Sequence, residues 1–279
     1  MKIKEIKFSR HVIFGDHRVE FGTQDIPMIS FLVGNNGSGK TRILDSIYQF
    51  LGSQDPVIGN ISNLNGSIIF NLELNPEESA ILGNRVNNIL YEVKKGQSDI
   101  TRQFLDVESG IKIDINPNNF FKIVYSTVEV NFNDHNISTV TSKDIDSVKN
   151  PREKSNNLSS EIPQLLIDIK SLDDSDKSSW LDKNNTGGPL PPLPVHIGNR
   201  LKRFIDAFHK IYDGDKIFYG IANKDGAKKI LFEDKNGLEL NLNDLSTGEK
   251  QIIYRIGYIL KELENIRGGI ILIDEPEIS

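Results

Sequence analysis

Apolar residues in the first part of the chain follow two different periods. Residues 3–8 and 19–21 predict two strands, and residues 67–74, apolar at every second position, predict a third. The short apolar run 28–33 predicts a buried strand. Between these strands, the apolar residues of segment 43–52 recur at helical spacing, which predicts a helix. The segment ends at Gly52, which can terminate that helix.

A second helix is predicted to start at Asn75-Pro76-Glu77-Glu78, which offers an N-cap, a proline at the first position and two acids in the first turn. We expect it to run to about Lys95 and to end at Gly96. Residues 100–115 are typical of a hairpin that turns at Ser109-Gly110, and residues 121–132 of a strand and its exit.

Residues 133–195 are rich in Asn, Ser, Asp and Lys, and they end in a proline-rich run, 187–194. We predict loop here, with one short helix at 162–169. The proline-rich run has two interpretations: a plain linker, or a polyproline II ligand for a partner.

The last third returns to regular patterns. An apolar stripe over residues 201–212 predicts a helix that faces a core. The pairs Asp225-Gly226 and Asn236-Gly237 predict hairpin turns. A further amphipathic helix is predicted after Ser246, and an apolar strand at 269–273.

Composition limits the classes of protein that fit. The chain has 279 residues, a net charge of −6 and no cysteine, so disulfides, zinc–thiolate sites and thiol nucleophiles are excluded. No apolar run approaches the ~20 residues that cross a bilayer, so we expect no membrane partner. The absence of cysteine fits a cytoplasmic, reducing compartment, which is the expected location. The acidic balance removes the electrostatic argument for nucleic acid, although a local basic face would suffice.

Residues 34–41 complete the phosphate-loop pattern G-x-x-x-x-G-K-[ST]. Its glycines let backbone N–H groups wrap a phosphate chain, the lysine adds a point charge, and the threonine offers a hydroxyl to Mg²⁺. The predicted strand before it and helix after it are the required setting. We therefore expect ATP and Mg²⁺ to bind at the following residues: Gly34, Asn35, Asn36, Gly37, Ser38, Gly39, Lys40, Thr41 and Arg42.

Near the end of the chain, the apolar strand 269–273 runs into Asp274-Glu275-Pro276. A buried parallel strand would deliver Asp274 beside the phosphate loop, where its carboxylate can hold Mg²⁺. Glu275 is then the candidate general base that takes a proton from attacking water, and Lys40 is its catalytic partner on the phosphates. A buried strand that happens to end in acids is the alternative.

Residues 245–251 read Leu-Ser-Thr-Gly-Glu-Lys-Gln and precede an amphipathic helix. Ser246 and Glu249 have the spacing of a capping box, so a well-capped helix explains them. A hydroxyl, a glycine (Gly248) and free N–H groups at a helix N-terminus also suit a phosphate. The two interpretations are compatible.

These residues resemble the signature motif of ABC-type ATPases, and the order of phosphate loop, signature and acidic strand is that of the family. The signature variant together with residues 274–279 is similar to the RecF, SMC and OLD branch, and most similar to ATPases of bacterial anti-phage systems such as Septu and its retron-linked relatives. Tyr125–Glu129 resembles a strand-end segment of that group. Thr41 and Leu245 are 204 positions apart, more than transporter subunits use, and no heptads indicate a long coiled coil.

The resemblance implies an α/β P-loop NTPase: an ABC-type ATPase head with a β-rich N-terminal part, a helical lobe and a polar insertion. The expected divisions are 1–132, with the phosphate loop; 133–199, the insertion; and 200–279, with the signature helix and acidic strand. Ser246, Gly248 and Glu249 would meet nucleotide held by a second subunit, in a head-to-tail dimer or higher oligomer. An effector such as a nuclease is the implied partner.

The chain also departs from the family. Its sequence ends at Ser279, before a D-loop and a switch histidine would follow. Glu129, Gln103 and Gln164 compete for the Q-loop position, and the adenine-contacting residues stay unassigned. Two other functions fit the same motifs: a RecF-like repair ATPase on DNA, and an ATP-gated scaffold that hardly hydrolyses ATP and holds a nuclease inactive. DNA or RNA is the other candidate partner.

Overall fold

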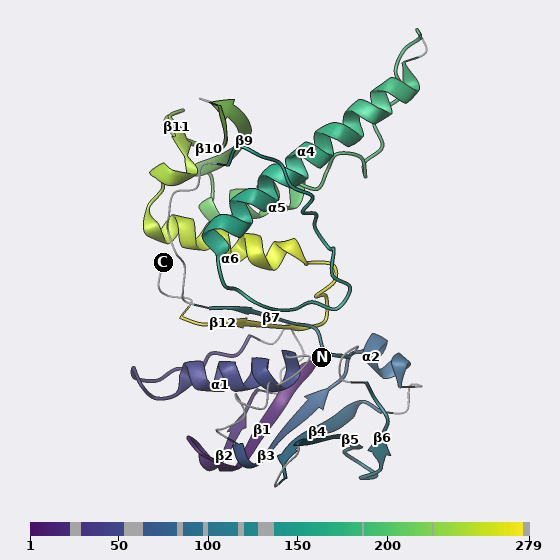
Figure 1. Cartoon of the computed structure of the whole chain (residues 1–279), viewed down its shortest axis with the longest axis vertical. Helices are drawn as coiled ribbons and strands as arrows, with labels where there is room; N and C mark the ends of the chain where they lie inside the picture. Colours follow the sequence, from purple (N-terminus) through teal and green to yellow (C-terminus); the bar gives the residue numbers. More distant parts are fainter. Residues whose placement is uncertain are drawn as a thin grey trace. The chain divides into compact units, whose positions relative to one another are not determined.

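A computed structural model describes residues 1–22, 29–52, 64–82, 86–96, 100–116, 120–127, 137–185, 187–224 and 226–275. The chain forms two units (Figure 1). The first comprises Met1–Tyr125, Asn150–Glu153 and Ile266–Leu272; the second comprises Ser126–Lys149, Lys154–Asn265 and Ile273–Ser279. Both units are therefore assembled from segments far apart in the sequence.

The first unit contains a six-stranded sheet in the order β2-β1-β3-β4-β5-β6. All its neighbouring strands are antiparallel. The strands are β1 (Lys2–His11), β2 (Gly15–Glu20), β3 (Leu64–Glu73), β4 (Asn88–Lys95), β5 (Ile100–Asp106) and β6 (Lys112–Ile113). The predicted N-terminal strands, the strand over 67–74 and the hairpin at Ser109-Gly110 are confirmed.

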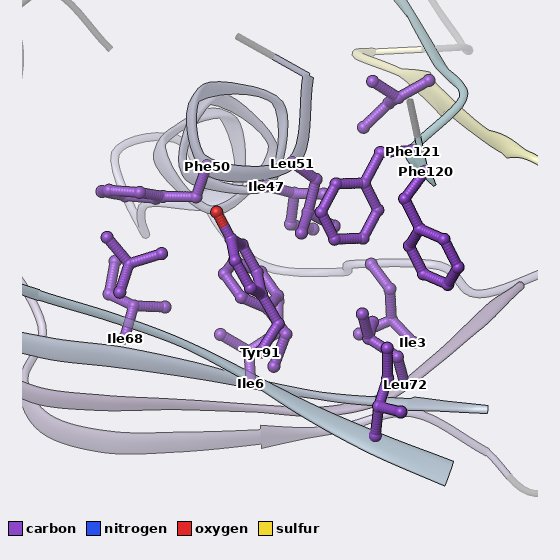
Figure 2. Close-up of a cluster of buried hydrophobic side chains, with 14 of the residues drawn as sticks. Ile3, Ile6, Ile47, Phe50, Leu51, Ile68, Leu72, Tyr91, Phe120 and Phe121 are labelled. Atoms are coloured by element: carbon purple, nitrogen blue, oxygen red, sulfur yellow. The ribbon is translucent and has the colours of Figure 1, made fainter. Parts of the chain in front are cut away.

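One face of this sheet and the helix that follows the phosphate loop share a core. Helix α1 (Lys40–Ile47) continues into a π-helical turn, η1 (Tyr48–Gly52), as the helical spacing predicts. Figure 2 shows the side chains of this helical segment above the sheet, with Phe120 and Phe121 at their side. Gly52 is needed there, because a Cβ would lie 2.7 Å from the side chain of Ile123. The core thus fixes the helix that starts at the phosphate loop.

The helix predicted over 76–95 is wrong beyond its first turns. Its capping box is confirmed, because Asn75 accepts from the Glu78 amide and Glu78 accepts from the Asn75 amide. Yet α2 (Pro76–Ile81) is short, and the chain then forms β4. Within β4, Ile89, Tyr91 and Val93 lie at every second position and are fully buried, whereas Leu90 between them is half-buried. Period two and pairing with β3 outweigh a good helix start.

The buried strand predicted over 28–33 is also wrong for its described residues, 29–33. They belong to no strand, and Ile29, Phe31 and Val33 are 76%, 76% and 92% exposed. A strand needs a neighbour for its backbone hydrogen bonds, and no described residue pairs with this run. An apolar run alone therefore does not determine pairing or burial.

The second unit combines helices with a small antiparallel sheet, ordered β11-β10-β9. Four phenylalanine rings, Phe204, Phe208, Phe218 and Phe232, meet between a helix and this sheet. Its elements are α4 (Leu158–Asn184), α5 (Lys202–Tyr212), β9 (Lys216–Lys224), β10 (Ala227–Asp234), β11 (Glu239–Asn241), the 3-10 turn η3 (Leu242–Asp244) and α6 (Thr247–Lys261). The predicted helices after 200 and after Ser246, and the turn at Asn236-Gly237, are confirmed; Asp225 lies outside the described residues.

Helix α4 corrects the loop predicted over 133–195: it has 27 residues where a short helix at 162–169 was expected. Its polar side chains have partners that the sequence does not reveal. The buried carboxylate of Asp168 accepts from the backbone amides of Thr141 and Lys143, at 2.8 and 3.3 Å. Asp173 accepts from the amides of Arg200 and Leu201. Distant segments thus satisfy polar residues that otherwise indicate loop.

A third sheet has the order β12-β7-β8, from β7 (Ile123–Ser126), β8 (Arg152–Lys154) and β12 (Ile270–Ile273). Strands β12 and β7 are parallel, because Ile270 and Asp274 donate to the carbonyls of Lys122 and Ser126 with the same offset. The predicted parallel strand before Asp274 is confirmed, but its full burial is not: Ile271 and Ile273 are 44% and 38% exposed. Residues 128–132 of the strand exit lie outside the described residues.

Candidate functional site

The phosphate-loop sequence forms a turn that leads directly into α1. Gly34–Ser38 are exposed and have no regular secondary structure, and the helix begins at Lys40. Gly37 and Gly39 have φ angles of 82° and 94°, in the left-handed region, and Gly39 is the N-cap of α1. Residues with a side chain rarely adopt these backbone angles, so both positions favour glycine.

Lys40 folds back onto the loop that precedes it. Its Nζ donates to the carbonyl of Gly34 at 2.8 Å and to that of Asn35 at 3.3 Å. The Ser38 amide also donates to the Asn35 carbonyl, at 3.1 Å, which closes the turn. The ammonium group therefore lies against the loop itself, where a phosphate would offer it charged and stronger acceptors.

The other predicted residues of this site lie along the same segment. A Cβ on Gly34 would come within 2.7 Å of Ser38 Oγ, so the loop closes tightly at that glycine. Asn36 is in the turn, and Thr41 and Arg42 are exposed in the first turn of α1. The structure thus keeps the whole predicted set together on one loop and one helix start.

One aromatic residue beside this loop was missed by the sequence analysis. Phe14 lies in the turn between β1 and β2, and its ring would be 3.1 Å from a Cβ placed on Gly39. The ring also contacts Phe8 and His11, with centroids 4.8 and 4.9 Å apart. Only the tertiary structure brings residue 14 to residue 39.

His11 fixes the backbone of that turn. Its Nδ1 accepts from the amides of Ile13 and Phe14, at 3.2 and 3.3 Å. Burial lowers the pKa of His11, which favours the neutral ring that these two hydrogen bonds need. The turn therefore holds Phe14 against the last glycine of the loop.

The acidic pair lies at the end of β12. Asp274 is 5% exposed, and its amide donates to the Ser126 carbonyl on β7 at 3.0 Å. Glu275 has a φ of 45°, which is rare for a residue with a side chain and costs on the order of 1–2 kcal/mol. The strand thus ends in a strained turn, and strained backbone conformations of this kind are frequent at functional sites.

Arg255, in the middle of α6, holds this turn. Its Nη1 donates to the carbonyls of Asp274 and Glu275, at 2.9 and 3.2 Å, and the residue is 7% exposed. Arg255 belongs to no recognisable sequence motif, and an arginine on an amphipathic helix is most simply a surface residue. The structure instead connects the signature helix with the backbone of the acidic pair.

The signature residues form the predicted capping box at the start of α6. The Glu249 carboxylate accepts from the amide and the hydroxyl of Ser246, both at 2.8 Å, and Ser246 Oγ accepts from the Glu249 amide at 3.3 Å. Thr247 and Gly248 complete the first turn. This turn is partly exposed, with Ser246 and Thr247 at the surface.

The last residue of α5 and the first residue of β9 bind the same turn. Lys216 makes an ion pair with Glu249, and Tyr212 donates its hydroxyl to the Glu249 carbonyl at 3.2 Å. Burial opposes ionisation of Glu249, but the hydrogen bonds from Lys216 and Ser246 outweigh it and lower the pKa of Glu249. Burial and the charge of Glu249 raise the pKa of Tyr212. Neither residue was predicted from sequence.

The predicted site residues fall in both units. The phosphate loop belongs to the first, and Asp274, Glu275 and the signature turn belong to the second. Of the Q-loop candidates, Gln103 is bonded to Glu92 within the sheet and Gln164 to Asp168 within α4. Glu129 lies outside the described residues.

In the part of the chain that the structure describes, no three His, Cys, Asp or Glu side chains group closely enough to hold a metal ion. Within the same residues, no helix has both the length and the apolar character to cross a membrane.

The chain is similar to known proteins over part of its length. It is 38% identical over 88 residues to DNA replication and repair protein RecF of Francisella tularensis subsp. novicida (strain U112), covering 26% of this chain and 24% of that protein. RecF of F. tularensis subsp. tularensis (strain SCHU S4 / Schu 4) gives the same values. Over that stretch, the chain resembles RecF. The match spans about a quarter of the length of these relatives.

No protein-family model matches the chain. Among solved structures, the Smc head domain with an extended coiled coil, bound to the C-terminal domain of ScpA and derived from Pyrococcus furiosus, aligns with a TM-score of 0.44 and 11% identity. That alignment covers 98% of this chain and 89% of the Smc chain.

Proposed function

We propose that the chain is an ABC-type ATPase that binds ATP through residues 34–41 and hydrolyses it. The observation that carries this proposal is the position of Lys40, whose Nζ lies 2.8 Å from the Gly34 carbonyl in a loop with two left-handed glycines. A cation held in a glycine loop at a helix start is suited to a chain of phosphates. The partial similarity to RecF supports the family.

The residues have separate roles in this proposal. Lys40 binds the β- and γ-phosphates, and Glu275 accepts a proton from attacking water. The Thr41 hydroxyl and the Asp274 carboxylate would hold Mg²⁺, which prefers oxygen ligands. When bound, the ion would neutralise charge on the phosphates. Arg255 supports this chemistry by fixing the backbone of Asp274 and Glu275.

Ser246 and Gly248 act, in this proposal, on nucleotide held by a second copy of the chain. Their turn is at the surface and at the N-terminus of a 15-residue helix, where an anion is favoured. Two copies in a head-to-tail arrangement would then close on ATP and open after hydrolysis, a population shift set by the difference in affinity.

Substitution of Lys40 tests the central assignment. Lys40→Ala should weaken ATP binding at least tenfold, about 1.4 kcal/mol, measured by calorimetry on the isolated chain. Lys112→Ala is the matched control, because Lys112 is an exposed lysine on the same unit. Equal affinity in the Lys40→Ala variant and the parent would refute the assignment of the loop.

Two finer proposals concern the biological role. The signature and acidic-strand sequences support control of an effector, such as a nuclease, in anti-phage defence in the cytoplasm. The similarity to a DNA replication and repair protein favours instead a RecF-like ATPase that acts on DNA.

ATP-dependent DNA binding that falls steeply with salt would support the RecF-like role. Co-purification of one stoichiometric partner, with no DNA binding, would support effector control. Slow single-turnover hydrolysis with tight ATP retention would indicate an ATP-gated scaffold.

A further inference from the structure

The first turn of α6 carries a negative charge at the place where the proposed function needs a phosphate. The Glu249 carboxylate lies 2.8 Å from Ser246 Oγ, the hydroxyl that would meet the γ-phosphate of a second copy. In the single chain, the carboxylate of Glu249 stabilises the N-terminus of α6. The same charge would repel an incoming phosphate, because like charges at short distance are unfavourable.

The structure contains a compensating group from another element. Lys216, the first residue of β9, pairs with the Glu249 carboxylate, and both side chains are 23% exposed. Solvent screens a half-buried ion pair less than an exposed one, so Lys216 and Glu249 attract each other more strongly. The positive charge of Lys216 therefore offsets the negative charge of Glu249 at this turn. Tyr212 holds the backbone of the same residue through the Glu249 carbonyl.

We propose that Lys216 is a positioning residue of the signature turn: it neutralises Glu249 and thereby allows Ser246 and Gly248 to accept the phosphate of ATP bound to a second copy of this chain. The inference rests on the proposed function. While Lys216 holds Oε1 of Glu249, the Ser246 hydroxyl can leave Oε2 without exposing an uncompensated carboxylate. Ser246 then caps the helix in the single chain and, with Gly248, binds the phosphate in the dimer.

Four variants test this proposal: Lys216→Met, Lys216→Arg, Glu249→Gln and the double variant Lys216→Met/Glu249→Gln. Each is measured for ATP affinity by calorimetry and for dimerisation by sedimentation with a non-hydrolysable ATP analogue and Mg²⁺. Glutamine is chosen because it also supports a capping box at this position. Thermal unfolding of each variant controls for loss of fold.

The expected pattern is specific to charge. Lys216→Met should weaken ATP-dependent dimerisation roughly tenfold, the order expected for one uncompensated charge in a partly screened site. Its ATP affinity as a monomer should stay within about twofold of the parent. Lys216→Arg should match the parent, and adding Glu249→Gln to Lys216→Met should recover most of the loss. The Lys216→Met defect should also shrink as salt is raised.

The results separate this inference from the proposed function. Dimerisation of Lys216→Met at the parental level, or a double variant worse than Lys216→Met, would overturn the role of Lys216 alone. A parent that binds ATP but stays monomeric would overturn both this inference and the action of Ser246 on a second copy. A parent that binds no ATP would overturn the proposed function itself.

Discussion

Substitution of Gly39 by alanine tests how the phosphate loop is built. Gly39 has a φ of 94°, and a Cβ there would lie 3.1 Å from the ring of Phe14. Gly37 is a matched control, because it has a φ of 82° but no atom within 4 Å of the added Cβ. The two substitutions therefore share backbone strain and differ in steric contact.

The magnitudes follow from these two effects. A left-handed conformation costs a residue with a side chain about 1–2 kcal/mol, so Gly37→Ala should lose about that much stability. Gly39→Ala adds an overpacked contact against a ring held by Phe8 and His11, which costs about 1–3 kcal/mol more. In a Phe14→Ala background, Gly39→Ala should cost only as much as Gly37→Ala.

Urea unfolding followed by circular dichroism measures the stability differences, and calorimetry with ATP measures binding. We expect Gly39→Ala to have the lower midpoint and the weaker ATP affinity of the two variants, with unchanged denaturant dependence. If Gly39→Ala is no more destabilising than Gly37→Ala, or if removing the Phe14 ring gives no relief, the contact between Phe14 and the loop does not constrain Gly39.

The remaining predictions concern chemistry and assembly. Glu275→Gln should bind ATP with parental affinity, hydrolyse it far more slowly and accumulate the dimer, as quench-flow and sedimentation would report; turnover at the parental rate would place the base elsewhere. Gly248→Asp adds a Cβ and a negative charge to the signature turn, so ATP binding should survive while ATP-dependent dimerisation and hydrolysis are lost. Mixing Gly248→Asp with Lys40→Ala should restore one intact site in each mixed pair. The absence of recovery in that mixture would contradict action across an interface.

Features that depend on a few neighbouring residues could be predicted from the sequence alone. The capping boxes at Asn75 and Ser246 form as their spacing predicts. The left-handed Gly39 and the start of α1 at Lys40 lie where G-x-x-x-x-G-K-[ST] places its second glycine and its lysine. Short-range hydrogen bonds and steric limits on φ act within one turn of chain, so a local pattern is enough to specify them.

Features that depend on a distant partner could be found only in the three-dimensional structure. The segment after Ile81 became strand β4 because β3 supplies its backbone partners. Helix α4 contains the buried Asp168 because the amides of Thr141 and Lys143 satisfy its carboxylate. Ile29, Phe31 and Val33 are exposed in spite of their apolar side chains, since burial requires a neighbouring strand.

The same distinction holds at the candidate site. Three local motifs and their order along the chain pointed to the candidate site residues Lys40, Ser246, Asp274 and Glu275. The contacts of Phe14 with Gly39, of Lys216 with Glu249 and of Arg255 with the end of β12 each join residues 19 or more positions apart. No local pattern encodes such contacts, because they arise only when packing of the core fixes where separate elements meet.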